Sequence, residues 1–251
     1  MKSAHLNSSE AGLSLVELMV ALSIGLLLTV SVGTILSGSL QIFRAQTESA
    51  RIQESGRFLM DILGRQITQA GYAAISTDYS DPKLAFAGTP ISGEHGLVAI
   101  RTDERKVGSD YLAVSFDASI DCQGNAVADG IARNEFYLNG NEELVCASGG
   151  GTSEVMADGV ESFLVHYGID ADGDYSVDRY KAQPVSSSDP ALDEWSKIRT
   201  VRVCVVVRAI SQGTSPTAQR YEDCSGVTQT APDTRLRRIL SATFQLRNRG
   251  I

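Results

Sequence analysis

The sequence contains few of the residues, and none of the short motifs, on which many enzyme active sites depend. Histidine occurs only as His5, His95 and His166 in 251 residues. These three are not spaced as in the zinc-binding HExxH motif, and neither a GxSxG nucleophile motif nor a Walker phosphate loop is present. We therefore predict that the chain is not an enzyme and that it needs no catalytic cofactor.

The sequence also lacks an excess of basic residues. It has 22 Lys and Arg against 30 Asp and Glu, a formal net charge of -8. This balance argues against a surface that generally binds nucleic acid. The arginines near the C-terminus are Arg235, Arg237, Arg238, Arg247 and Arg249. Charges of this kind are ordinary on an exposed strand, so we place Arg237 and Arg247 on a solvent face and do not expect DNA as a partner.

Charge is entirely absent from Leu18 to Phe43, a run of 26 residues. At about 1.5 Å per helical residue, this run is longer than the roughly 30 Å thickness of a bilayer core. It therefore predicts a membrane-spanning helix. Glu17 stands at the start of the run, and an ionised carboxylate costs about 2.5 to 3.5 kcal/mol at the bilayer centre and less near an edge. Such a carboxylate needs a partner.

Two ordinary interpretations of this segment stay open. A secretory signal peptide has a basic head, an apolar region of about 7 to 15 residues and a small-residue cleavage site. Residues 37–39 (SGS) imitate such a site, but this run is longer and begins with an acid. A plain single-pass anchor would hold Glu17 at the level of the lipid headgroups without any further role.

The order of residues around Gly12 favours a more specific interpretation. A glycine, an apolar residue after it, Glu17 five positions after the glycine and a long apolar helix resemble the class III signal of type IV pilins and type II secretion pseudopilins. The resemblance implies that prepilin peptidase cleaves between Gly12 and Leu13, that the new Leu13 terminus is methylated, and that the helix is kept as anchor and filament core. The sequence departs from the usual signal in having Lys2 balanced by Glu10 and Leu13 where Phe is commoner.

This resemblance gives Glu17 a role in assembly. The carboxylate would pair with the amine of Leu13, in the same chain or in a neighbouring subunit. A subunit inserted out of register would leave a carboxylate unpaired in apolar surroundings, which is costly. The pair would therefore set the stagger between subunits.

The helix is predicted to continue beyond the membrane, since no proline occurs before Pro82. Apolar residues at three- and four-residue steps mark one packing face: Ile52, Leu59, Ile62, Leu63, Ile67 and Ala70. Gly56 and Gly64 indicate bends or close neighbours, and Gly71 is a plausible terminator. The expected organisation is a leader over 1–12, a helix over 13–71 and a β-rich head over 72–251.

Beyond the helix, apolar residues recur at every second position. Residues 73–110 are rich in turn formers and predict a long connection. Alternation over 112–116, 163–169, 201–207 and 240–246 predicts strands, and Asn139-Gly140 predicts a hairpin. Because one face of such a sheet needs a core partner, we expect it to pack on the apolar stripe of the helix. The predicted fold class is α+β, with a long N-terminal membrane-spanning helix on an antiparallel β-sheet head, as in type IV pilins.

Cysteine occurs four times, with no CxxC pair: Cys122, Cys146, Cys204 and Cys224. Behind a translocation signal, four cysteines predict two disulfides in an oxidising compartment. Three connectivities are open; the local pairs Cys122 with Cys146 and Cys204 with Cys224 suit the spacing, and each would contribute roughly 3 kcal/mol. Four free buried thiols are the alternative.

A turn rich in aspartate carries candidate metal ligands. Asp170, Asp172, Asp174 and Asp178 occupy relative positions 1, 3, 5 and 9, which suits the oxygen coordination of calcium. However, Gly173 falls at position 4 instead of 6, and Lys181 replaces the glutamate expected at position 12. A calcium-supported loop and a hairpin tip whose carboxylates cap its own amides are both open.

The C-terminal half carries a second resemblance. Residues 167–174 (YGIDADGD), 178–180 (DRY), 201–208 and 246–249 (LRNR) are similar to the PilW family of minor pilins, as are residues 51–58 and 69–72. The resemblance implies a low-abundance subunit that helps to prime pilus assembly near the filament tip. Its implied partners are other minor pilins, the major pilin, prepilin peptidase, the inner-membrane assembly platform and, before assembly, membrane lipid.

The implied location is a single pass through the inner membrane with the head in the periplasm, followed by the extracellular pilus. Two other functions stay open. A type II secretion pseudopilin shares both the signal and the expected architecture. A membrane-tethered surface-binding protein that never polymerises would share the anchor alone.

Overall fold

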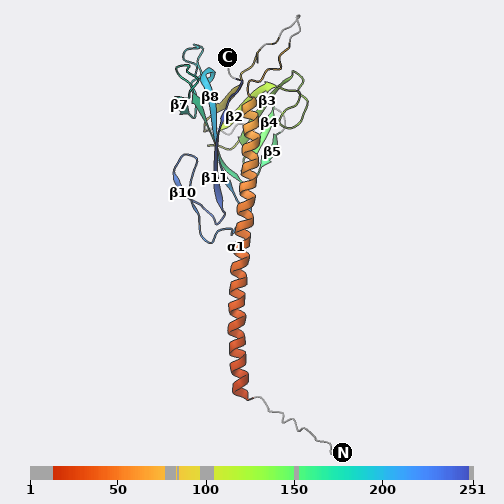
Figure 1. Ribbon diagram of the computed structural model, residues 1–251, viewed down its shortest axis with the longest axis vertical. Coiled ribbons are helices and arrows are strands. Elements are labelled where there is room, and N and C mark those ends of the chain that lie inside the picture. Colours follow the sequence, from red (N-terminus) through yellow and green to blue (C-terminus); the bar gives the residue numbers. More distant parts are fainter. Residues whose placement is uncertain (1–13, 77–82, 84, 97–104, 150–152, 249–251) are drawn as a thin grey trace, which may run out of the picture. The chain divides into compact units, whose positions relative to one another are not determined.

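The computed structural model describes residues 14–76, 83, 85–96, 105–149 and 153–248 (Figure 1). It divides into two compact units, residues 1–46 and 47–251. One helix, α1 (Leu15–Gln69), contributes to both. The remaining elements are β1 (Ile91–Glu94), β2 (Tyr111–Asp117), β3 (Ile131–Leu138), β4 (Leu144–Ser148), β5 (Ser153–Ala157), β6 (Val160–Ile169), β7 (Arg179–Lys181), the short 3-10 helix η1 (Trp195–Lys197), β8 (Ile198–Arg208), β9 (Arg220–Glu222), β10 (Thr228–Thr230) and β11 (Arg237–Gln245).

The strands of the second unit form three antiparallel sheets. One has five strands in the order β1-β2-β3-β4-β5, one has four in the order β11-β8-β6-β7, and β9 pairs with β10. The predicted strands correspond to β2, β6, β8 and β11, and Asn139-Gly140 lies in the connection of the β3–β4 hairpin. The predicted α+β fold is therefore confirmed. In its described residues the connection expected over 73–110 contains the strand β1, and the apolar stretch 97–100 lies outside the described residues.

The C-terminal half of α1 packs into the core of the head. Leu59, Leu63 and Ile67 are fully or almost fully buried in one cluster with Phe136 of β3 and Phe163 of β6. The apolar stripe read from the sequence therefore does contact the sheets. Burying side chains of this size stabilises a fold by about 1.5 to 3 kcal/mol each.

Glycines allow β11 to approach the helix closely. A Cβ atom placed on Gly56 would lie 2.6 Å from the side chain of Leu240, and one on Gly64 would lie 2.5 Å from Phe244. Both distances are shorter than van der Waals contact. Close approach, rather than a bend, therefore explains these two helical glycines.

The helix ends where the chain needs a sharp turn. Gly71 has φ of +76°, a left-handed conformation that glycine adopts without steric cost. The side-chain amide of Asn248, just after β11, donates to the carbonyls of Thr68, Gln69 and Ala70 at 3.3 to 3.4 Å. Two ends of the head, far apart in sequence, are thereby joined at the last turn of α1.

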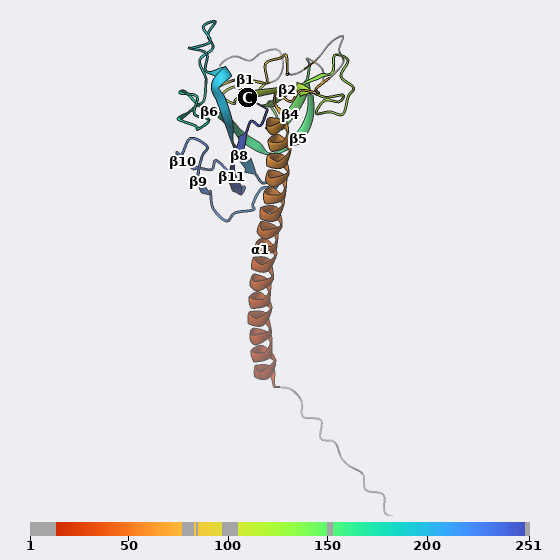
Figure 2. The same cartoon turned by 45° about the horizontal axis from the view of Figure 1, so that its top comes forward.

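Segment 209–236 covers part of the outer face of the four-stranded sheet. Figure 2 shows its β9–β10 hairpin beside β8 and β11. Cys204 and Val206 of β8 are buried although they face away from the helix-facing core, and Ala231 of the segment is buried as well. A disulfide from Cys204 to Cys224 holds this segment to the sheet.

Arg237 corrects one prediction from the sequence. We expected it on a solvent face, but it is only 2% exposed. Its guanidinium donates to both carboxylate oxygens of Glu161 and to Asp233, each at 2.7 Å. The alternation in β11 did not reveal that segment 209–236 folds across this end of the strand. Arg247 is exposed as expected, and Arg249 lies outside the described residues.

A second ionic cluster fixes the segment between β7 and β8. Glu194, which is 7% exposed, accepts hydrogen bonds from Lys181, from Arg179 and from the backbone N–H of Val185. Burial opposes the charged carboxylate, but these hydrogen bonds outweigh it and lower the pKa of Glu194 to about 2. The ionised form is therefore bound more tightly in the folded chain than in the unfolded one.

This pKa predicts an acid dependence of stability. The contribution of ionised Glu194 to the free energy of unfolding is complete above the ordinary carboxyl pKa of 4.5. It is lost as the pH falls toward about 2. Thermal melting of the full chain in detergent, followed through Trp195, should show Glu194→Gln below wild type at pH 7. That difference should shrink steadily between about pH 4.5 and pH 2. A difference that is constant over this range would contradict the assignment.

Candidate assembly site

Glu17 takes part in a reciprocal cap at the start of α1. Its Oε2 accepts a hydrogen bond from the backbone N–H of Ser14 at 3.0 Å, and the Ser14 hydroxyl accepts one from the N–H of Val16 at 3.3 Å. Residues 14–17 thus form the Ser-x-x-Glu capping box, which satisfies backbone donors that a helix leaves free at its N-terminus. The Ser-x-x-Glu pattern of this capping box is present in the sequence at residues 14–17.

The predicted cleavage residues, Gly12 and Leu13, lie outside the described residues. Glu17 nevertheless bonds the backbone nitrogen of Ser14, the residue directly after Leu13. Cleavage would turn the backbone nitrogen of Leu13 into a free amine. In the sequence this amine comes directly before the Ser14 nitrogen that the Glu17 carboxylate already contacts. This geometry suits pairing within one chain as well as pairing with a neighbour.

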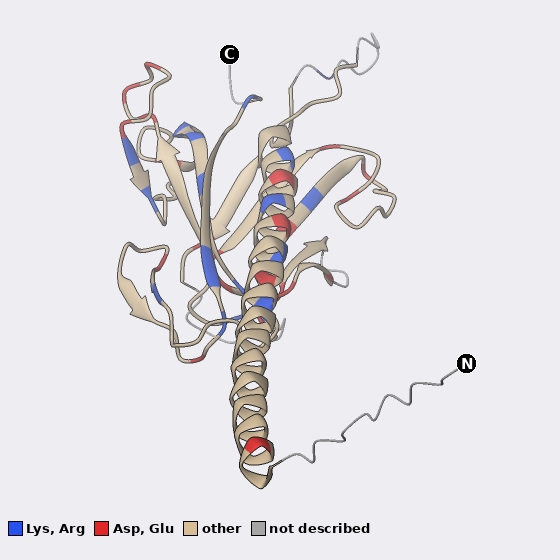
Figure 3. Cartoon of the chain, turned by 60° about the horizontal axis from the view of Figure 1, so that its bottom comes forward, with Lys and Arg blue, Asp and Glu red and all other residues tan. Residues whose placement is uncertain are grey.

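The apolar part of α1 presents no unsatisfied hydroxyl among Ser23, Thr29, Ser31, Thr34 and Ser37. Each donates to a backbone carbonyl three or four residues earlier, at 2.7 to 2.9 Å. Between Leu15 and Phe43, Glu17 is the only charged residue (Figure 3). By length and composition, α1 can cross a membrane. Polar groups that bond within their own helix are tolerated in lipid.

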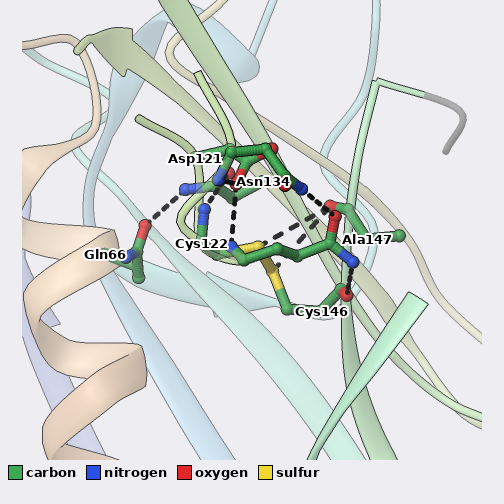
Figure 4. Close-up of a disulfide and its surroundings, with 8 residues drawn as sticks. Gln66, Asp121, Cys122, Asn134, Cys146 and Ala147 are labelled. Atoms are coloured by element: carbon green, nitrogen blue, oxygen red, sulfur yellow. Dashed lines mark hydrogen bonds between the residues drawn. A yellow bond between two sulfur atoms is a disulfide. The ribbon is translucent and has the colours of Figure 1, made fainter. Parts of the chain in front are cut away.

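Two disulfides join the cysteines in local pairs, Cys122 with Cys146 and Cys204 with Cys224, and no free cysteine remains among the described residues. Figure 4 shows the first of them beside Asn134. This amide accepts the backbone N–H of Cys122 at 3.1 Å and donates to Gln66 of α1 at 2.7 Å. The disulfide loop is thereby connected to the helix. Nothing in the sequence pattern pointed to Gln66 or Asn134.

The aspartates of the turn between β6 and β7 bond mainly to the turn itself. Asp170 is buried; its Oδ1 accepts the N–H of Gly173, and its Oδ2 accepts the N–H of Tyr175 and the Nε–H of Arg199. Carboxylate oxygens of Asp170, Asp172 and Asp174 lie within 4.8 Å of one another. Asp178, which is outside that group, accepts the N–H of Ala171.

These bonds favour the self-capped turn over a calcium site, because a cation would have to displace the guanidinium of Arg199 from Asp170. We expect the melting temperature of the full chain to be the same in millimolar calcium and in a chelator. Magnesium at the same concentration controls for ionic strength, since it fits poorly in such cages. A rise that is specific to calcium and disappears in Asp172→Asn would contradict this expectation and establish the site.

Of the described histidines, His95 and His166 both lie close enough to the buried carboxylate of Asp110 to interact with it and with each other. His166 of β6 lies opposite Arg202 of β8, and burial lowers its pKa. His95 bonds the buried carboxylate of Asp110 through Nδ1 at 2.9 Å, and His5 lies outside the described residues. Asp110 also accepts backbone N–H groups from Gly96 and Val165. Its role is therefore to join the β1 end to β6.

The sequence and the fold were compared with known proteins. Residues 131–248 match the family described as Type IV Pilus-assembly protein W, and residues 7–33 match the prokaryotic N-terminal methylation motif. No curated protein matches the chain.

Two solved structures are similar in fold. A type IV-like pilin, TTHA1219 from Thermus thermophilus, has 14% sequence identity and a TM-score of 0.48, with 80% of this chain and 98% of that chain covered. A chain in the GspK-GspI-GspJ complex of the type 2 secretion system of enterotoxigenic Escherichia coli has 10% identity and a TM-score of 0.36, with 75% and 96% covered.

The two family matches cover the N-terminal signal and the C-terminal half of the chain, whereas residues 51–58 and 69–72, which also resemble the PilW family, lie outside both. One contains Gly12 and Glu17, and the other contains the strands from β3 to β11. The capped, membrane-compatible helix and the antiparallel head agree with both. Residues 131–248 of this chain therefore match the PilW family of type IV pilus-assembly proteins, and residues 7–33 carry the methylation motif.

Proposed function

We propose that this chain is a minor pilin that helps to start pilus assembly and occupies a position near the tip of the filament. In this proposal prepilin peptidase removes residues 1–12, the mature chain waits in the inner membrane with its head in the periplasm, and the assembly platform then moves it into the pilus. Other minor pilins and the major pilin are its neighbours. Its contribution is structural, with no catalytic step.

One observation carries the proposal. Glu17 is the only charged residue between Leu15 and Phe43, and its carboxylate already bonds the backbone next to the predicted new terminus. A carboxylate kept there needs a positive partner in apolar surroundings. Disulfides within the head further support an oxidising compartment outside the cytoplasm.

Substitution of Gly12 tests the proposal in cells that carry the gene at its own locus. We expect Gly12→Ala to keep the leader, seen as a larger chain on immunoblots, and to lose surface pili to the level of a gene deletion. Gly140→Ala in the head is the matched control, since a Cβ on Gly140 meets no atom within 4 Å. Normal numbers of pili with an uncleaved leader would overturn the proposal.

The same strains separate the two rival functions. Lost secretion of type II exoproteins with normal pili would assign the chain to a secretion pseudopilus. A protein that stays functional at the cell surface without entering any filament would be a tethered binding protein. Purified pili probed for the wild-type chain with antibody distinguish this last outcome.

A further inference from the structure

The head contains a cavity of about 450 Å³, and none of its lining residues belongs to the N-terminal segment that carries Glu17. It is lined by the last turns of α1, the end of β2, the loop that carries Cys122, one residue of β3 and the residues after β11. Cavities that bind small molecules usually measure about 300 to 1,000 Å³ and combine apolar surface with a few fixed polar groups. The size alone therefore permits a small ligand.

Side-chain amides form a large part of the lining: Gln66, Gln69, Asn134 and Asn248. Asn134 is fully buried and is held by Cys122 and Gln66, as Figure 4 shows. Asn248 is held by the carbonyls at the end of α1. Each amide offers both donors and an acceptor, and these bonds use only part of that capacity. The cavity thus has amides in fixed positions with hydrogen-bonding capacity to spare.

Two carboxylates complete the polar lining. Asp117 is buried, and its Oδ2 accepts the backbone N–H of Ala74 at 2.8 Å and pairs with Lys83 at 2.6 Å. Its Oδ1 is buried without a hydrogen-bond partner in the described part of the chain. A buried acceptor in this state costs about 1 to 3 kcal/mol, so a hydroxyl donor that reached it would be favoured. Asp121 is fixed by the N–H groups of Gln123 and Asn125.

Aromatic surface and charge balance narrow the ligand class. Tyr72, 49% exposed, and Phe116, 5% exposed, contribute rings to the lining. Among the charged side chains that line the cavity, Arg247 offsets one of the two carboxylates, and Lys83 already neutralises Asp117. A strongly anionic or cationic ligand would therefore gain little.

We propose that this cavity binds a neutral carbohydrate of one or two residues. A sugar hydroxyl both donates and accepts hydrogen bonds, which matches fixed amides and carboxylates. The C–H face of a sugar ring packs on an aromatic ring such as that of Tyr72. The proposal is independent of the assembly role, because no residue of the cavity belongs to the N-terminal segment.

Saturation-transfer NMR on the full chain tests the proposal. The chain is kept in a zwitterionic detergent, since detergents with maltose or glucose headgroups would compete. The probes are glucose, galactose, N-acetylglucosamine, lactose and N,N'-diacetylchitobiose at millimolar concentration. We expect at least one of these probes to bind wild type, and Tyr72→Ala to weaken that binding by about tenfold, which corresponds to about 1.4 kcal/mol.

Phe58→Ala is the matched control, because Phe58 is an exposed aromatic residue of α1 outside the cavity, 56% exposed. It should bind as wild type does. A second variant, Gln69→Ala, changes an exposed side chain of the lining and should also weaken binding. The proposal is overturned if no probe binds wild type or if Tyr72→Ala and Gln69→Ala bind unchanged. It is also overturned if these variants lose a partner pilin in pull-down while no sugar binds.

Discussion

Glu17→Gln is expected to leave removal of the leader intact and to prevent entry of the chain into pili. Glutamine keeps an oxygen that can accept the Ser14 N–H, so the capping box survives. It removes only the negative charge. The N-terminal amine of Leu13 would then have no negative partner in apolar surroundings. This should reduce the free energy of assembly by on the order of 3 kcal/mol, which is a factor of about 100 in the assembly equilibrium. Immunoblots of sheared pili and of membranes measure both steps.

Ser14→Ala provides the matching control for Glu17→Gln. It removes the hydroxyl of the cap but keeps the carboxylate, at an expected cost of about 1 kcal/mol in helix stability. Pili should still contain this variant. If Glu17→Gln assembles normally whereas Ser14→Ala does not, the carboxylate serves the helix cap, and its role in subunit register is wrong.

Arg237→Ala should cause a large loss of stability in the head. The substitution leaves Glu161 and Asp233 without the cation that all three 2.7 Å hydrogen bonds depend on. Removal of one partner from a buried ionic cluster typically costs about 3 to 5 kcal/mol. Since Asp233 is partly exposed, we expect the lower end, about 3 kcal/mol. For a chain of this size that is a fall of roughly 6 to 12 °C in melting temperature.

The neighbouring residue serves as the control for Arg237→Ala. Arg238 is exposed, and its only described hydrogen bond reaches Ser49 at 3.4 Å. Arg238→Ala should therefore change stability by no more than about 0.5 kcal/mol. Melting of both variants, followed by the fluorescence of Trp195, compares them directly. Equal effects would show that the Arg237 cluster adds nothing beyond an ordinary surface charge.

Local patterns predicted the parts of the fold that local patterns control. The uncharged run, the stripe containing Leu59 and Leu63, and the period of two in β8 and β11 each report which side of an element meets apolar surroundings. Gly56 and Gly64 were ambiguous because the sequence shows that a helix tolerates them, not which strand lies next to them. Leu240 and Phe244 supply that information only once β11 is in place.

The parts that were missed depend on contacts between distant residues. Arg237 bonds Glu161, which is 76 positions away, and the covering segment 209–236 has no strong period of its own. The cavity combines Gln66, Asn134 and Asn248, which come from three separated regions. By contrast, the capping box of Ser14 and Glu17 was present in four consecutive residues. A local pattern of this kind can be read from the sequence without knowledge of the fold.

The hydrogen bonds of the α1 hydroxyls affect how easily the helix can move between lipid and the side chains of other helices. Ser23, Thr29, Ser31, Thr34 and Ser37 all bond carbonyls of their own helix. None of these bonds has to break or form when lipid tails around the helix are exchanged for the side chains of other helices. These five hydroxyls therefore add no cost of breaking hydrogen bonds when the helix passes between the two surroundings, in either direction. Extension and retraction of a filament need this kind of reversibility.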